Sequence, residues 1–181
     1  ATFNLTDTTL VAEDVKYIKV ADVAVFPGDG RVEIRENANI QPLENAMIIA
    51  DTADKTHLIT EAKVNIESKY SYKASGTYAY QNLVDDIQII RFDNIMVDTG
   101  YQTIAEGKIT EEQQFMFSPQ FTFMGDVSLN AGNPLLNFDG SFQINQDCDP
   151  ALSRWVNFTG RIKPDSVVFP VPKQPKEYGG R

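Results

Sequence analysis

Length, composition and charge restrict the class of this protein. The chain has 181 residues, of which 42% are hydrophobic and 23% charged; this fits one domain with its own core and excludes a disordered or fibrous composition. The formal net charge of −9 argues against nucleic acid and anionic membranes as partners. No apolar run approaches the roughly 20 residues of a transmembrane helix, so we expect a soluble protein without a transmembrane segment.

The N-terminal residues carry little patterning. The first residue is Ala1 rather than methionine, and no signal sequence precedes the first apolar segment. We therefore expect a processed product or a piece of a longer chain, with residues 1–14 as an N-terminal extension.

The clearest pattern is an alternation of apolar and polar residues from Ala62 to Tyr72. Every second residue is apolar, aromatic or small, while the odd-numbered residues between them are polar. Because successive side chains of a strand point to opposite faces, this predicts a strand with one buried and one exposed face. Lys73–Gly76 supply turn chemistry, and Tyr78 and Tyr80 resume the alternation, so the sequence predicts a hairpin.

A second hairpin is predicted further along the chain. Residues 121–129 and 138–144 alternate in the same way, and Ala131–Pro134 between them form the expected turn. Shorter alternations occur at residues 31–35 and 101–109. Helical signals are weak: Thr110–Gln114 suit a single turn, and Pro150–Val156 a short helix capped by Asp149. The sequence therefore predicts an all-β protein.

Glycine recurs in the pattern Gly-x-apolar. Six glycines follow it: Gly30, Gly76, Gly107, Gly125, Gly140 and Gly160. Glycine inside a strand marks a bulge, a bend or a close approach of backbones. One such residue per strand favours a repeat-built β domain over residues 15–162, in the form of a stacked-strand β-roll or solenoid-like double sheet. The alternative is a Greek-key β-sandwich whose glycines bend the edge strands.

The C-terminal residues 163–181 have a different composition. Prolines at 164, 170, 172 and 175 are incompatible with a helix or a central strand and favour a Pro-rich tail or linker.

Three short segments resemble a known family. Ala21–Pro27, Gly30–Ile34 and Ala46–Asp51 are similar to segments of organic-solvent-tolerance (OstA-like) proteins, the lipopolysaccharide-transport domains. Residues 62–149 are similar to repeats in large β-rich envelope proteins of Bacteroidetes-type bacteria. The resemblance implies a β-roll whose interior carries acyl chains or is filled, in a bacterial cell-envelope or extracellular protein. The chain departs from the family in its bulky tyrosines, which could fill the interior themselves.

Candidate catalytic residues are few. His57 is the only histidine, and it lies in a loop-like run without a nucleophile-elbow motif. Cys148 is the only cysteine, which excludes an internal disulfide. Asp147 and Asp149 flank it, and negative neighbours make a thiol less nucleophilic. We therefore predict no catalytic residue and no enzymatic activity.

Two groups of residues are candidate binding sites. Asn145, Asp147 and Asp149 place oxygen ligands two residues apart, which suits Ca²⁺; an acidic turn with a helix cap explains the same residues, and no other cofactor is expected. Tyr70, Tyr72, Tyr78 and Tyr80 would share one face of the first hairpin. Such a face stacks sugars or lines an apolar groove, or else cross-strand tyrosine pairs stabilise the sheet.

The functional expectation is a non-catalytic β module of a larger cell-envelope or secreted protein, acting as scaffold, adhesive surface or lipid conduit. Its partners would be other modules of a longer chain or envelope components, with lipid or glycan as candidate ligands. The alternative is a carbohydrate-binding β-sandwich that uses the aromatic face, and a hydrolase is the third hypothesis.

Overall fold

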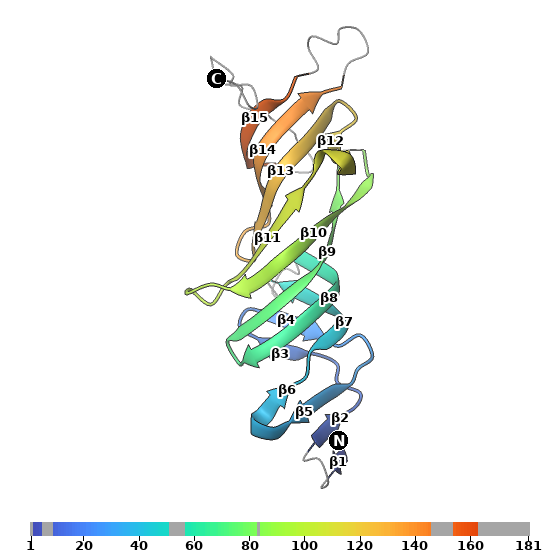
Figure 1. Cartoon of the computed structure of the whole chain (residues 1–181), viewed down its shortest axis with the longest axis vertical. Helices are drawn as coiled ribbons and strands as arrows, with labels where there is room; N and C mark the ends of the chain where they lie inside the picture. The colour runs from blue at the N-terminus through green and yellow to red at the C-terminus, as the bar shows by residue number, and fades with distance from the viewer. Residues whose placement is uncertain (1, 5–8, 51–56, 83, 146–153, 163–181) are drawn as a thin grey trace. The chain divides into compact units, whose positions relative to one another are not determined.

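The computed structural model describes residues 2–4, 9–50, 57–82, 84–145 and 154–162. Within these ranges the chain forms antiparallel strands and two single-turn 3₁₀ helices, and no α-helix (Figure 1). The prediction of an all-β protein is confirmed. None of the helical segments in the described ranges has the length and apolarity to cross a membrane.

Two compact units make up the chain. Unit 1 comprises Ala1–Tyr78, Arg91–Ala105 and Asn130–Pro134, and unit 2 comprises Ala79–Ile90, Glu106–Leu129 and Leu135–Arg181. The strands β9 (Ser71–Gln81), β10 (Ile87–Val97) and β11 (Thr103–Ile109) contribute residues to both.

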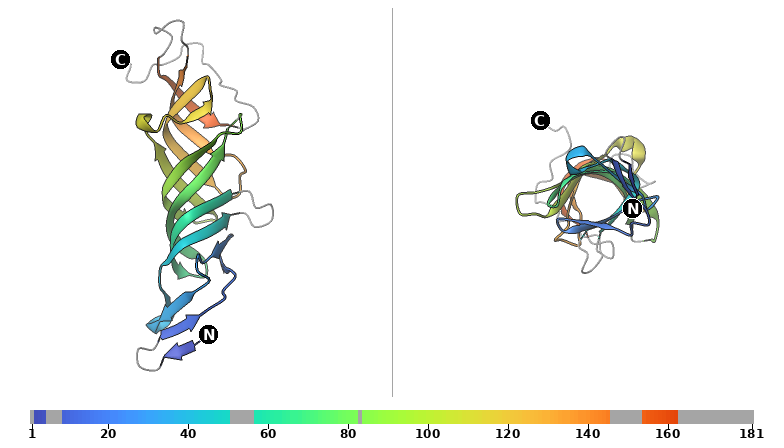
Figure 2. Two further views of the ribbon diagram at one scale, coloured as in Figure 1. Left: turned by 90° about the vertical axis from the view of Figure 1, so that its right-hand side faces the viewer. Right: turned by 90° about the horizontal axis from the view of Figure 1, so that it is seen from below.

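Unit 1 contains two sheets. The smaller has the order β1-β2-β5-β6, and the larger has the order β11-β10-β9-β8-β7-β4-β3. Figure 2 shows β7 and β8 as neighbouring cyan and teal ribbons. The bounds of its other strands are β1 Thr2–Asn4, β2 Thr9–Ala12, β3 Ile18–Val20, β4 Val23–Phe26, β5 Val32–Arg35, β6 Asn39–Ile40, β7 Leu43–Ala50 and β8 His57–Ser68; the 3₁₀ helix η1 covers Glu36–Ala38. Strands β1 and β2 come from the segment that the sequence predicted to be an N-terminal extension.

Unit 2 contains the order β15-β14-β13-β11-β10-β9, with β12 paired to β13. Its further elements are η2 Glu111–Gln113, β12 Met116–Ser118, β13 Phe121–Asn130, β14 Asn137–Ile144 and β15 Val156–Arg161. In both units the strand order rises with chain position, but in unit 1 β2 pairs with β5 and β4 pairs with β7, so the chain passes between the two sheets. A Greek key would instead bring a fourth strand back beside the first. The predicted hairpin of residues 121–144 and the predicted single turn after Thr110 are both present. Of the predicted helix at 150–156, residues 150–153 lie outside the described ranges, and Val156 begins β15.

The first predicted hairpin is present, but its turn is not where the sequence placed it. Strands β8 and β9 pair Ile66 with Tyr72 and Ser68 with Ser71, so the chain reverses at Lys69 and Tyr70. The predicted turn at 73–76 is therefore wrong, because these residues lie inside β9. Gly76 is needed there for another reason: a Cβ at this position would lie 2.6 Å from Cγ2 of Ile59.

Alternation along β8 and β9 determines which side chains form the core of unit 1. Ala62, Val64 and Ile66 are buried, as predicted, and the residues between them are exposed. The largest fully buried side chains of unit 1 are Tyr72, Phe92, Ile48, Ile59, Ile95 and His57.

An aromatic cluster forms the core of unit 2. Phe138 on β14 lies 4.8 Å from Phe117 and 5.3 Å from Phe123, measured between ring centroids. Both contacts are edge-to-face, with interplanar angles of 90° and 82°, which is a favourable geometry for aromatic quadrupoles. All three rings are completely buried.

Candidate functional site

The four tyrosines singled out in the sequence have different environments. Tyr72 and Tyr80 are 1% and 3% exposed, Tyr78 is half-buried, and Tyr70 is 54% exposed. The even-numbered positions of β9 point into the core, whereas Tyr70 lies in the turn before the strand begins. Only one of the four therefore presents most of its ring to solvent.

The predicted calcium ligands are only partly described. Asp147 and Asp149 lie outside the described residues, as does Cys148. The Asn145 side chain accepts a hydrogen bond from Thr122 Oγ1 at 3.0 Å and donates one to the Pro119 carbonyl at 3.1 Å. Among the residues that the structure describes, no group of three or more Asp, Glu, His or Cys side chains is arranged to hold a metal ion.

His57 is completely buried at the start of β8. Its Nε2 lies 2.6 Å from the Asn133 carbonyl oxygen, to which it donates a hydrogen bond. Its ring also packs against Tyr78, with 5.9 Å between the ring centroids. These contacts fasten the loop at Asn133 to the core of unit 1.

A buried polar network connects β9, β11 and the turn between β3 and β4. Thr103 is completely buried; its backbone N–H donates to Oδ2 of Asp22 at 2.9 Å and its hydroxyl to Oδ1 at 2.7 Å. Because the Thr103 hydroxyl donates to the carboxylate, the Tyr72 hydroxyl donates to Thr103 Oγ1, at 2.8 Å. Neither Asp22 nor Thr103 was identified from the sequence as an interacting residue. The only local signal was the position of Asp22, an acidic residue directly before the apolar run of residues 23–26.

The network affects the ionisation of Tyr72. Burial raises the pKa of the Tyr72 hydroxyl far above its ordinary value, and the charge of Asp22 raises it further. A raised pKa means that the folded state retains the proton at a pH where the unfolded chain has lost it. The protonated Tyr72 hydroxyl therefore contributes its full stabilisation below about pH 10, the ordinary tyrosine pKa. This contribution to the free energy of unfolding declines as the pH rises further.

We expect the stability of the wild-type chain to fall more steeply above about pH 10 than that of Tyr72→Phe. The variant cannot ionise at this position, and Tyr78, whose pKa is also raised by burial, is the same in both chains. Urea denaturation at a series of pH values between about 9 and 12 measures the two slopes. If the free energy of unfolding fell equally steeply with pH in both chains, the loss of stability at alkaline pH could not be assigned to Tyr72.

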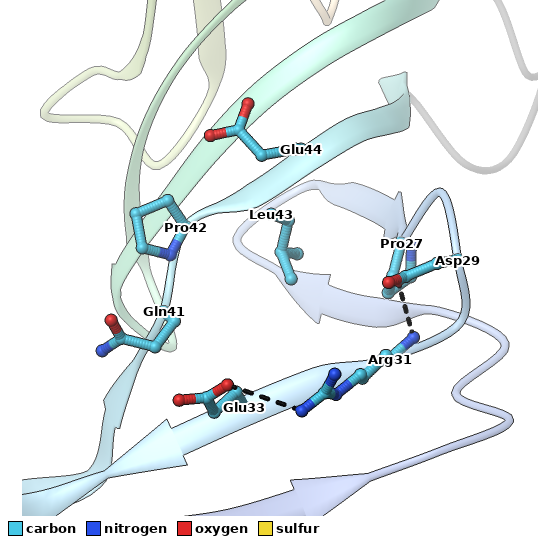
Figure 3. A pocket seen from close by; sticks show the side chains of 8 residues that line it. All are labelled: Pro27, Asp29, Arg31, Glu33, Gln41, Pro42, Leu43 and Glu44. Carbon is cyan, nitrogen blue, oxygen red and sulfur yellow. Dashed lines mark hydrogen bonds and ion pairs between the residues drawn. The ribbon is translucent and has the colours of Figure 1, made fainter.

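A small surface pocket lies between β5 and the start of β7 in unit 1 (Figure 3). Its volume is about 210 Å³. The Asp29 carboxylate accepts a hydrogen bond from the backbone N–H of Arg31 at 2.9 Å, and the Arg31 guanidinium lies 3.7 Å from Glu33. The lining residues are Pro27, Asp29, Arg31, Glu33, Gln41, Pro42, Leu43 and Glu44. Arg31 and Glu33 pair with each other, and Glu44 pairs with Lys63 outside the pocket at 2.6 Å, so the pocket offers a polar surface and no reactive constellation.

A second, acidic depression of about 450 Å³ lies on unit 2. Asp126 on β13 stands opposite Asp139 on β14, and Glu106 on β11 also lines the depression. Thr159 Oγ1 donates a hydrogen bond to Asp139 at 2.6 Å. Like charges at directly opposed strand positions reduce the stability of a sheet. A gain in stability therefore does not explain the pairing of Asp126 with Asp139.

Two exposed tyrosines meet on the surface of unit 1. Tyr70 lies in the β8–β9 turn and Tyr101 in the β10–β11 turn, and their ring centroids are 5.5 Å apart with the planes tilted by 59°. Tyr101 is 62% exposed. The ammonium group of Lys69 lies 5.3 Å from the centroid of the Tyr70 ring. Tyr70 was a predicted ligand-binding residue; Tyr101 was not, because pairing two turns 31 residues apart requires the tertiary structure.

Comparison with known proteins gives no relative from which a function could be transferred: no family model, curated protein or solved structure matches the chain.

Proposed function

We propose that this chain is a non-catalytic β module of a larger cell-envelope or secreted protein, acting as a scaffold or adhesive surface and not as a lipid conduit. The observation that carries the proposal is the filling of both cores by side chains. A conduit for acyl chains needs an apolar interior that is open to a ligand. In unit 2 that space is occupied by the fully buried rings of Phe117, Phe123 and Phe138, and in unit 1 by Tyr72 and Phe92.

The position of the only histidine supports a non-catalytic role. A general base must lie within hydrogen-bond reach of the proton that it removes from a substrate. His57 is completely buried, and its Nε2 is already bound to the Asn133 carbonyl. The resemblance of Ala21–Pro27, Gly30–Ile34, Ala46–Asp51 and residues 62–149 to envelope proteins supports the proposed location.

Titration with a fluorescent long-chain fatty acid tests the scaffold role against lipid carriage. We expect no saturable signal from the wild-type chain, since binding would require displacement of buried aromatic rings. The matched control is Phe117→Trp, which adds volume to the same core. Saturable binding to the wild type that this variant abolishes would show that the interior accepts an acyl chain, and would overturn the proposal.

A further inference from the structure

We propose that Tyr70 and Tyr101, together with Lys69, form a binding platform for a neutral glycan. This inference concerns the outer surface of unit 1 and does not depend on the scaffold role or on the state of the core. It differs from the aromatic face expected from the sequence, because Tyr72 and Tyr80 are buried and Tyr101 takes their place.

The backbone of Tyr101 is the first argument. Its φ is +61°, in the left-handed region that a bulky residue adopts only at an energetic cost. Gly100 immediately before it would tolerate this conformation without cost, yet the positive φ belongs to the tyrosine. A strained residue with an exposed aromatic side chain is unfavourable for folding alone, which supports a role of the ring in binding.

The turn that carries Tyr101 is held rigidly. The Asp98 carbonyl accepts a hydrogen bond from the Tyr101 N–H at 3.1 Å. Oδ1 of Asp98 accepts two more, from the backbone N–H groups of Gly100 at 2.8 Å and Gln102 at 2.9 Å. The backbone of this turn is therefore ordered before a ligand binds, which lowers the entropic cost of binding.

The turn that carries Tyr70 is also anchored. The Lys69 carbonyl accepts a hydrogen bond from the N–H of Ala21 at 3.0 Å, and the Ser68 hydroxyl accepts one from the N–H of Tyr70 at 3.2 Å. Two rings from separate turns, tilted by 59° to one another, thus form an aromatic surface, in which Tyr70 is 54% and Tyr101 62% exposed.

The chemistry around the rings favours a sugar. Aromatic rings stack on the apolar C–H face of a pyranose, and polar groups beside them bind its hydroxyls. The Lys69 ammonium lies over the Tyr70 ring, 5.3 Å from its centroid, and is a hydrogen-bond donor; the two phenol hydroxyls both donate and accept. The neighbouring positions Glu67, Ser68 and Ser71 are polar and can hydrogen-bond to the hydroxyls of a sugar. The net charge of −9 favours a neutral glycan over an acidic one.

Calorimetric titration with neutral oligosaccharides tests the proposal, using hexasaccharides of β-linked glucose, α-linked glucose, xylose and mannose. We expect at least one to bind with a Kd below about 1 mM, and Tyr70→Ala or Tyr101→Ala to weaken that binding by at least about tenfold. Tyr17→Ala is the matched control, because Tyr17 is also in unit 1 and 56% exposed but packs against Phe26; it should leave binding unchanged.

A second variant separates ligand binding from folding. Tyr101→Gly removes both the ring and the backbone strain, so we expect its Tm to rise by about 1–3 °C while binding is lost. The proposal is overturned if none of the four glycans binds, or if Tyr17→Ala weakens binding as much as Tyr101→Ala. Binding of a proline decapeptide that Tyr101→Ala abolishes, with no glycan bound, would assign the platform to peptides and overturn it as well.

Discussion

Replacing Gly140 with valine should destabilise unit 2 by about 3 kcal/mol or more. Gly140 on β14 stands directly opposite Gly125 on β13, and the two backbones approach too closely for a side chain. A Cβ at Gly140 would overlap the Met124 carbonyl oxygen and lie 2.6 Å from Cα of Gly125. Since backbone atoms cannot rotate away as a side-chain end could, the variant must separate the two strands.

Two further variants identify the cause. Gly140→Ala should also be strongly destabilising, because the clash arises at Cβ, whereas Ser128→Val on β13 should change the free energy of unfolding by no more than about 0.5 kcal/mol. Chemical denaturation, followed by the fluorescence of the single tryptophan Trp155 in unit 2, measures all three. Equal midpoints for Gly140→Val and Ser128→Val would contradict the close-approach explanation.

Truncating Phe138 to alanine should cost about 3–5 kcal/mol. This ring is completely buried and contacts four other aromatic rings, those of Tyr80, Phe115, Phe117 and Phe123. The rigid rings around it cannot collapse into the space that it leaves, so the loss of contacts adds to the loss of apolar burial.

Ile87→Ala is the control for this prediction. Ile87 is a large apolar residue of the same unit, but it is 62% exposed, so its truncation should cost less than about 0.5 kcal/mol. Urea denaturation curves of the two variants give the comparison. Similar losses of stability would mean that the aromatic cluster contributes no more than an exposed side chain.

The candidate surface shows what sequence patterns could not reveal. The alternating pattern of residues 62–72 identifies Tyr70 as a candidate. The alternation does not continue through this residue, however, because the chain turns at Lys69 and Tyr70. Tyr101 follows Gly100 in an ordinary-looking turn, and nothing local marks its positive φ. Asp22 and Thr103 are 81 residues apart, and neither has a sequence neighbour that indicates the hydrogen bonds between them.

Local sequence patterns are sufficient to predict the β class, the hairpin of residues 121–144, the turn after Thr110 and the buried positions of β8, because these depend on local periodicity and turn chemistry. They also mark Gly125 and Gly140 as sites of a bulge, a bend or a close approach, and the structure shows that the two backbones approach closely. The tertiary structure decided which tyrosines are buried, where β8 turns into β9, and which two turns bring Tyr70 beside Tyr101. Strand register and contacts between distant turns depend on the packing of the whole sheet, and the energy of that packing is not encoded in any short segment.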